Sequence, residues 1–183
     1  VRVAMDAGQE MGDTVATRLR AAGVEVRFVP GSGTPAGLQH AKFMLVDATT
    51  LLTGSNNWSS TGTSINEESS IVIASRDGDP ILAGFTCHFD AIWTKNHAGA
   101  TACSTPEAKF SPGTEPIKML KEELQHSTKT IDVLMHHLAF DDLVKELAKA
   151  AERGVKVRVI VNATDRMEHT GTAWDRLIAA GGQ

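Results

Sequence analysis

The beginning and the end of this chain carry the same sequence pattern, which limits the folds it can adopt. Residues 1–3 and 157–159 both read Val-Arg-Val, and residues 18–23 and 176–181 share Arg-Leu-x-Ala-Ala-Gly. Internal self-similarity is a stronger guide to architecture than local propensity. A glycine just after an alanine-rich helix end is typical of a left-handed helix stop. Both ends are therefore predicted to form the same unit of strand, polar loop, helix and glycine stop.

Hydrophobic periodicity and turn residues predict alternating strands and helices between these two copies. The order strand, helix, strand, helix after residue 130 predicts an α/β fold with parallel pairing in that region. Strands are expected at 24–29, 41–47, 50–54, 69–74, 130–135 and 155–161, helices at 79–94, 115–126 and 140–153, and a Gly/Ala/Thr/Pro-rich linker at 96–114.

A short segment in the first half concentrates side chains suited to chemistry. His40 and Lys42 are two residues apart, so on a strand they would share one face. The apolar run 43–46 would bury that strand, and Ser55 and Asn57 follow the next strand with the same spacing. A nucleophilic imidazole, a cation and two neutral polar groups at adjacent strand ends suit an anionic phosphodiester.

The full pattern is H-x-K-x4-D-x6-G-S-x-N, running from His40 through Asp47 to Asn57. Together with Asn66-Glu67-Glu68 downstream and residues 21–27 upstream, it resembles the signature of the phospholipase D superfamily. The resemblance implies a mixed sheet flanked by helices, usually present as two repeats in one chain. Accordingly, residues 1–95 are expected to be the C-terminal part of one repeat, 96–114 a linker, and 115–183 the N-terminal part of a second repeat.

This resemblance implies a two-step displacement without a metal ion or cofactor. One histidine attacks phosphorus and forms a phosphohistidine, while a second histidine protonates the leaving alcohol and then activates water or another alcohol. His40 is the only histidine here in an H-x-K motif, so it acts as nucleophile or as acid. The second histidine is expected from another copy of the chain or from a second repeat.

The remaining motif residues receive their roles from the same resemblance. Lys42, Ser55 and Asn57 are expected to contact the phosphate oxygens, where negative charge builds up. Glu68 matches the carboxylate that orients an imidazole, and its neighbour Glu67 competes for that role. Asp47 belongs to the catalytic motif and resembles a structural partner more than a proton shuttle.

Three further residues are candidates for lining a pocket. His136 and His137 follow the apolar strand 131–135, and strand ends carry sites in α/β folds. Trp58 directly follows Asn57. The alternative for the two histidines is half-exposed packing, and the alternative for Trp58 is simple core burial.

The net charge limits the classes of binding partner, and three hypotheses about function stay open. The 183 residues carry a net charge of −4, which argues against a dedicated nucleic-acid binder but leaves room for a local basic groove. Phospholipid phosphodiester hydrolysis or transfer, with peripheral membrane contact, is the leading hypothesis. A nuclease of the same superfamily is the first alternative, and a non-catalytic pairing module with half a site is the second.

The two cysteines, Cys87 and Cys103, lie sixteen residues apart around a small-residue loop. Two interpretations stay open, a disulfide that closes the loop or two unrelated thiols. A disulfide would stabilise the fold by ~3 kcal/mol and would favour an exported protein. Neither cysteine has the neighbours of a metal site.

Overall fold

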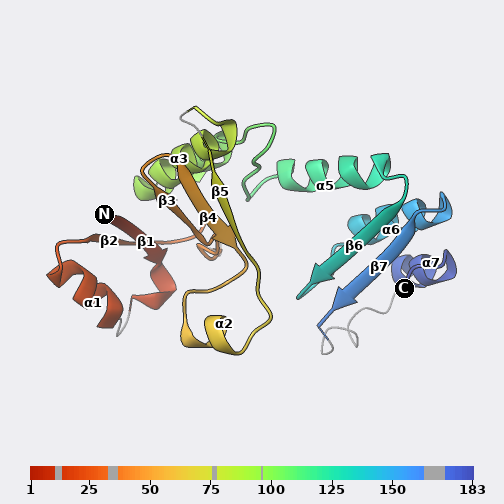
Figure 1. The fold of residues 1–183 in the computed structure, drawn as a ribbon, viewed down its shortest axis with the longest axis horizontal. Coiled ribbons are helices and arrows are strands. Elements are labelled where there is room, and N and C mark those ends of the chain that lie inside the picture. Colours follow the sequence, from red (N-terminus) through yellow and green to blue (C-terminus); the bar gives the residue numbers. More distant parts are fainter. Residues whose placement is uncertain (11–13, 33–36, 76–77, 96, 163–171) are drawn as a thin grey trace. The chain divides into compact units, whose positions relative to one another are not determined.

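The computed structural model describes residues 1–10, 14–32, 37–75, 78–95, 97–162 and 172–183 (Figure 1). The chain divides into two compact units, unit 1 (Val1–Gly113) and unit 2 (Thr114–Gln183). In chain order the elements are β1 (Arg2–Asp6), the 3-10 helix η1 (Ala7–Gln9), α1 (Thr14–Ala21), β2 (Glu25–Val29), β3 (Phe43–Val46), β4 (Thr50–Gly54), α2 (Ser60–Ser64), β5 (Ser70–Ala74), α3 (Pro80–Trp93), α4 (His97–Ala102), α5 (Glu115–His126), β6 (Thr130–Met135), α6 (Asp141–Glu152), β7 (Lys156–Val161) and α7 (Thr172–Ala179).

The fold is α/β, as expected, but its strands form three separate sheets among the described residues. β1 pairs with β2, and β6 with β7, both in parallel, while β3, β4 and β5 form an antiparallel sheet. The resemblance implies a mixed sheet instead. The connections account for the direction of pairing within each sheet, because a helix links the strands of each parallel pair, whereas a short turn links β3 to β4.

Unit 1 is organised around α3, which packs against strands of both its sheets. Ile92 of α3 is buried with Val29 of β2 and with Ala100. The ring of Phe43 in β3 lies 5.1 Å from Phe85 of α3 in an edge-to-face arrangement. Such pairs add stability beyond the area they bury, so α3 fixes the strand that directly follows Lys42.

The segment predicted to be a linker is structured in the described residues. It contains α4, and its Cys103, Ala108 and Phe110 are buried. Cys103 forms a disulfide with Cys87 of α3, and Nδ1 of the buried His88 lies 2.9 Å from the carbonyl oxygen of Ala100. These cross-links hold a stretch whose small-residue composition alone indicates a loop. The boundary between the units therefore follows Gly113, while the assignment to repeats and the export suggested by a disulfide remain predictions.

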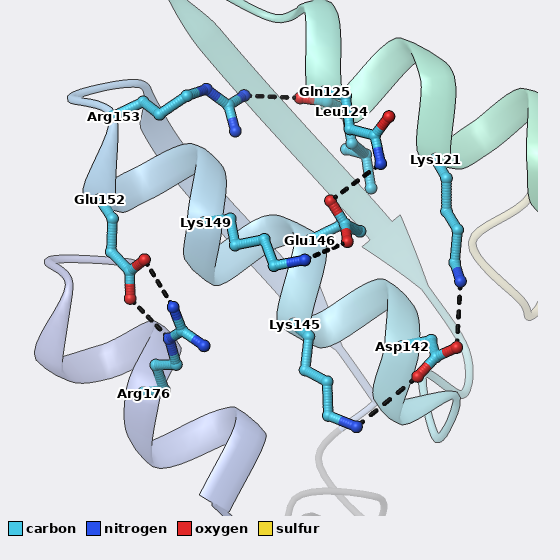
Figure 2. Close-up of polar contacts among 10 residues, drawn as sticks. All are labelled: Lys121, Leu124, Gln125, Asp142, Lys145, Glu146, Lys149, Glu152, Arg153 and Arg176. Carbon is cyan, nitrogen blue, oxygen red and sulfur yellow. Dashed lines mark hydrogen bonds and ion pairs between the residues drawn. The ribbon is translucent and has the colours of Figure 1, made fainter.

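Unit 2 is a β–α–β crossover with a further helix on each side in sequence. α6 buries Val144, Leu147 and Ala148 against β7, where Val157 is 1% exposed. Its polar side is tied to α5 by Lys121–Asp142 at 3.0 Å and to α7 by two Glu152–Arg176 bonds of 2.6 and 2.7 Å (Figure 2). This is the parallel arrangement that the sequence pattern predicts for the second half.

The described residues contain no helix that is both long and apolar enough to cross a bilayer.

Replacing Ala48 with Gly should stabilise the protein. Asp47 and Ala48 in the β3–β4 turn have φ of 51° and 53°, and the amide of Thr49 donates to the carbonyl of Val46 at 3.1 Å. Two left-handed residues in succession are typical of a type I′ turn, and alanine there is strained by roughly 1–2 kcal/mol. Part of the relief is offset by the entropy of glycine, so we expect a gain of about 0.5–1 kcal/mol in urea unfolding. An unchanged or lower free energy of unfolding would contradict this prediction.

Candidate active site

Three of the motif residues, Lys42, Ser55 and Glu68, lie at one end of the antiparallel sheet. In the register of that sheet Phe43 lies opposite Thr53, which lies opposite Ile71. Lys42 precedes the first of these positions, Ser55 follows the second, and Glu68 comes shortly before the third. Antiparallel pairing therefore brings together three side chains that are up to 26 residues apart in sequence.

The strand that carries the motif begins later than the sequence predicts. β3 starts at Phe43, so His40 and Lys42 lie in the irregular segment before it instead of on one face of a strand. The carbonyl of Lys42 accepts a bond from the Thr53 hydroxyl at 3.0 Å. The Thr53 hydroxyl thus donates to a carbonyl that would accept from a backbone amide in a regular β-ladder. The ladder between β3 and β4 ends at this point.

His40 is exposed, and Lys42 is half-buried beside it. The ammonium of Lys42 donates to the carbonyl oxygen of His40 at 2.7 Å. Among the described residues the His40 imidazole makes no hydrogen bond, so its ring is accessible to a substrate. Lys42 thus places its charge next to the backbone of the candidate nucleophile.

Glu68 is held by hydrogen bonds to both carboxylate oxygens. The Ser55 hydroxyl donates to Oε2 at 2.5 Å, and the Asn66 amide donates to Oε1 at 3.2 Å. The backbone amide of Ser69 in turn donates to the Ser55 oxygen at 3.1 Å. The sequence pattern identified Ser55 and Glu68 as site residues, but it gave no sign that they bond to each other.

These contacts shift the charges of the site. The bonds from Ser55 and then Asn66, together with the nearby Lys42 ammonium, lower the pKa of Glu68. Burial lowers the pKa of Lys42, and the Glu68 charge opposes that effect. The site therefore keeps a carboxylate ionised beside a partly desolvated ammonium, which is a combination common at functional sites.

Replacing Asn66 with Ala should raise the pKa of Glu68. The lost bond stabilises the ionised carboxylate, so its removal makes protonation easier and moves the titration to higher pH. Carbon-13 NMR titration of the side-chain carboxyls measures this shift. Glu67→Gln is the control, since it changes the neighbouring carboxylate without touching the Ser55–Glu68–Asn66 contacts. An unmoved Glu68 titration in Asn66→Ala would contradict the geometry.

The Gly-Ser-x-Asn loop is packed tightly against α2. Ser59 caps this helix by accepting from the Gly62 amide at 3.2 Å. A Cβ atom at Gly62 would collide with the carbonyl of Asn57 and lie 2.7 Å from Oδ1 of Asn56. That Oδ1 is buried and has no hydrogen-bond partner within the described part of the chain. The sequence pattern singles out neither Asn56 nor Gly62, because Asn56 is the unspecified position x of the motif and Gly62 lies outside the motif.

The remaining candidates lie at different places: one in the β3–β4 turn, two just after Ser55, and two in unit 2. Asp47 lies in the turn at the opposite end of β3 from Lys42, which fits a structural role. Trp58 is 62% exposed, which contradicts simple core burial. His136 and His137 follow β6 in unit 2 and are exposed, and Nδ1 of His136 lies 3.3 Å from the Asn162 amide. Asn57 is exposed next to Trp58. Pocket lining by Trp58 and the two histidines remains a prediction.

No group of three or more histidine, cysteine or carboxylate side chains in the described ranges is arranged to hold a metal ion.

Comparison with known proteins agrees with the motif. Residues 4–93 and 120–183 match the model of the family described as "Cardiolipin synthase, PLD-like domain". A curated relative, the mitochondrial cardiolipin hydrolase of Xenopus tropicalis, is 37% identical over 75 residues, or 41% of this chain. The match covers 32% of that protein, so the chain corresponds to about a third of its length.

A solved structure shares the fold. The polyphosphate kinase of Porphyromonas gingivalis aligns with 88% of this chain at a TM-score of 0.56 and 16% identity. The match spans 26% of the kinase chain. At this level of identity the likeness establishes the arrangement of helices and strands alone.

Proposed function

The chain belongs to the cardiolipin synthase, PLD-like domain family, and we propose that it is a metal-independent phosphodiesterase that cleaves phospholipids through a phosphohistidine on His40. The strongest support for this proposal is the position of three side chains. Lys42, Ser55 and Glu68 lie at the same end of the antiparallel sheet, and the accessible His40 lies beside Lys42. A fixed cation beside a nucleophile supplies the charge that a metal ion provides elsewhere.

A phospholipid is the substrate class that the comparison favours. The curated relative is named a cardiolipin hydrolase, and its alignment with this chain supports cardiolipin as the first lipid to test. The net charge of −4 gives no general attraction to nucleic acid. The head group, and the choice between water and another alcohol as acceptor, are left to the assay.

The proposed reaction has two displacements at phosphorus. A nitrogen of the His40 imidazole attacks phosphorus, the bond from phosphorus to the leaving alcohol oxygen breaks, and a second histidine gives that oxygen its proton. The same second histidine then takes a proton from water. The water oxygen attacks phosphorus, and the bond to His40 breaks to release the phosphate monoester.

The phosphate contacts are assigned to Lys42 and Asn57. Ser55 was expected to donate to the phosphate as well, but its one hydroxyl proton is given to Glu68. This supports a positioning role for Ser55, in which it holds Glu68 close to Lys42. Glu68 is proposed to orient an imidazole of the assembled site.

The second histidine is proposed to come from a second H-x-K motif, carried by another copy of the chain or by a second repeat. His40 is the only histidine followed two positions later by lysine in the 183 residues. Light scattering under assay conditions measures the size of the active species. Full turnover by a strictly monomeric protein would contradict this part of the proposal.

The test of the proposed function is a product assay on a panel of phospholipids, with single-stranded and duplex DNA beside them. We expect release of a lipid phosphate monoester from cardiolipin or a related phospholipid and no DNA cleavage. DNA cleavage without lipid hydrolysis would replace the proposal by a nuclease. Inactivity of the verified oligomer on both substrates would replace it by a non-catalytic pairing module.

Chelation should leave the activity intact. The proposed charge stabilisation comes from Lys42, so turnover in excess EDTA should equal turnover in buffer that contains Mg²⁺ or Ca²⁺. Initial rates over a chelator series measure this. Loss of turnover in EDTA that is restored by one divalent ion would contradict the metal-independent mechanism.

A further inference from the structure

The backbone around His40 is held by side chains, because the segment 37–42 belongs to no helix or strand. In the described part of the chain, side chains bond to backbone groups of Gln39, His40 and Lys42. The bond from the Lys42 ammonium to the His40 carbonyl lies within the segment and moves with it. The position of His40 relative to the sheets of unit 1 therefore depends on the two bonds that come from outside the segment.

The bond on the N-terminal side of His40 comes from Asp6 at the end of β1. The backbone amide of Gln39 donates to Oδ2 of Asp6 at 2.7 Å, across 33 residues of sequence. The other carboxylate oxygen, Oδ1, accepts from the amide of Gly8 at 2.8 Å and caps η1. Hydrogen bonds to an ionised acceptor are roughly twice as strong as those to a neutral one. Because the cap fixes the side chain of Asp6, its second oxygen is held in place for Gln39.

The bond on the C-terminal side of His40 comes from Thr53 of β4, whose hydroxyl donates to the Lys42 carbonyl at 3.0 Å. His40 lies between these two anchors, one residue after Gln39 and two before Lys42. Its imidazole is exposed and makes no hydrogen bond among the described residues, so its position is set by its backbone. Among these contacts, loss of the Asp6 bond would leave His40 anchored to the sheets on its C-terminal side alone.

The end of β1 is a rigid base for this contact. In the parallel pairing of β1 with β2, Asp6 lies opposite Val29, which is fully buried and packs with Ile92 of α3. Asp6 is itself half-buried. Functional groups commonly lie at the carboxyl ends of parallel strands in α/β folds. The motif pattern gives no sign of Asp6, because this residue lies far upstream of His40 in the sequence.

We propose that Asp6 is a positioning residue of the reaction, which holds the His40 imidazole, through the Gln39 amide, at the place from which it attacks phosphorus. This inference rests on the proposed role of His40. The attacking nitrogen must lie about 3–3.5 Å from phosphorus, and a displacement of about 1 Å can lower the rate by about 10²-fold. Asp6 acts on the geometry of the chemical step, so its loss should lower kcat and leave KM nearly unchanged.

The test compares Asp6→Ala and Asp6→Asn with the wild-type protein on the preferred substrate of the panel. Asp6→Ala removes both acceptors, so we expect kcat to fall by about 10–100-fold and the Gln39 amide to exchange about tenfold faster by NMR. Asp6→Asn keeps the size of the side chain but offers one neutral acceptor to two amide donors. Its kcat should lie between those of the wild type and Asp6→Ala, and it decides the matter if Asp6→Ala does not fold. A wild-type kcat in a folded Asp6→Asn protein would overturn the proposal.

Asp79→Ala is the matched control for loss of stability. Asp79 also accepts two hydrogen bonds, from the Ile81 amide at 2.8 Å and from the Ser75 hydroxyl at 2.6 Å, and it caps α3. Its replacement should lower the midpoint of urea unfolding, as the Asp6 variants do, but should leave kcat and the Gln39 exchange unchanged. If kcat fell as far in Asp79→Ala as in Asp6→Ala, the effect would follow stability alone, which would overturn the proposal.

The exchange measurement separates this inference from the proposed function. A wild-type protein that cleaves the substrate while Asp6→Ala cleaves it equally fast would overturn the role of Asp6 and leave the proposed function standing. A wild-type protein that cleaves neither lipid nor DNA would overturn the proposed function. The Gln39 amide still decides in that case whether Asp6 holds the segment, since faster exchange in Asp6→Ala supports the contact and equal exchange overturns it.

Discussion

His40→Asn should lower the rate of phospholipid cleavage by at least about 10³-fold, because it removes the nucleophile of the first displacement and, in an assembly of two copies, the proton donor as well. Asn keeps a similar size and polarity but forms no stable phosphoryl adduct. His40 is exposed and precedes β3, so its replacement should leave unfolding unchanged. Steady-state rates on the preferred lipid measure the effect.

A matched control separates this effect from a general loss of histidine. His126 is also exposed, at the end of α5, and its Nδ1 lies 2.8 Å from the carbonyl of Glu122. His126→Asn should keep the wild-type rate. A His40→Asn protein with near wild-type turnover would refute the assignment of the motif, since no other residue of the chain has an imidazole at the same spacing.

Lys42→Met should lower kcat by about 10²–10³-fold, the typical effect of removing one charged or hydrogen-bonding group aimed at the transition state. The variant removes the proposed phosphate cation and also the 2.7 Å bond to the His40 carbonyl. Because Lys42 should act mainly where charge develops, kcat should fall more than KM rises. Lys42→Arg should recover part of the rate, since it restores the charge with a different geometry.

Lys118 provides the control for Lys42. It lies on α5 and pairs with Glu115 at 2.7 Å on the surface, so Lys118→Met should leave both kinetic constants unchanged. A Lys42→Met protein whose loss appears only in KM would show that Lys42 contributes uniform substrate binding, which contradicts its proposed role in the chemical step.

The elements that the sequence predicts well are those whose stability comes from periodic burial. α6 has apolar residues at helical spacing and ends before Gly154, whose φ is 90°, so its limits follow from the pattern. The short helices α2 and α4 were not predicted. α2 reads Ser-Thr-Gly-Thr-Ser and depends on its Ser59 cap, and α4 depends on the Cys87–Cys103 disulfide beside it. Both helices therefore depend on contacts that the helix propensities of their own residues do not predict.

The candidate site was predicted as a set of residues but not as a network. The spacing of His40, Lys42 and Ser55 correctly indicated that these residues lie near strand ends. The expected strand 41–47 includes Lys42 and begins directly after His40, whereas the observed strand begins at Phe43. The bond from Ser55 to Glu68 depends on the register of β4 against β5, and register is set by packing over the whole sheet.

The most direct test of the account is the location of the phosphoryl group during turnover. Wild-type protein quenched while it hydrolyses phospholipid, digested with trypsin at alkaline pH and analysed by mass spectrometry should carry an acid-labile, base-stable phosphate on the peptide of residues 28–42, whose only histidine is His40. The His40→Asn protein should carry none. Turnover with no such adduct under these conditions, or a phosphate on a serine or another histidine, would contradict it.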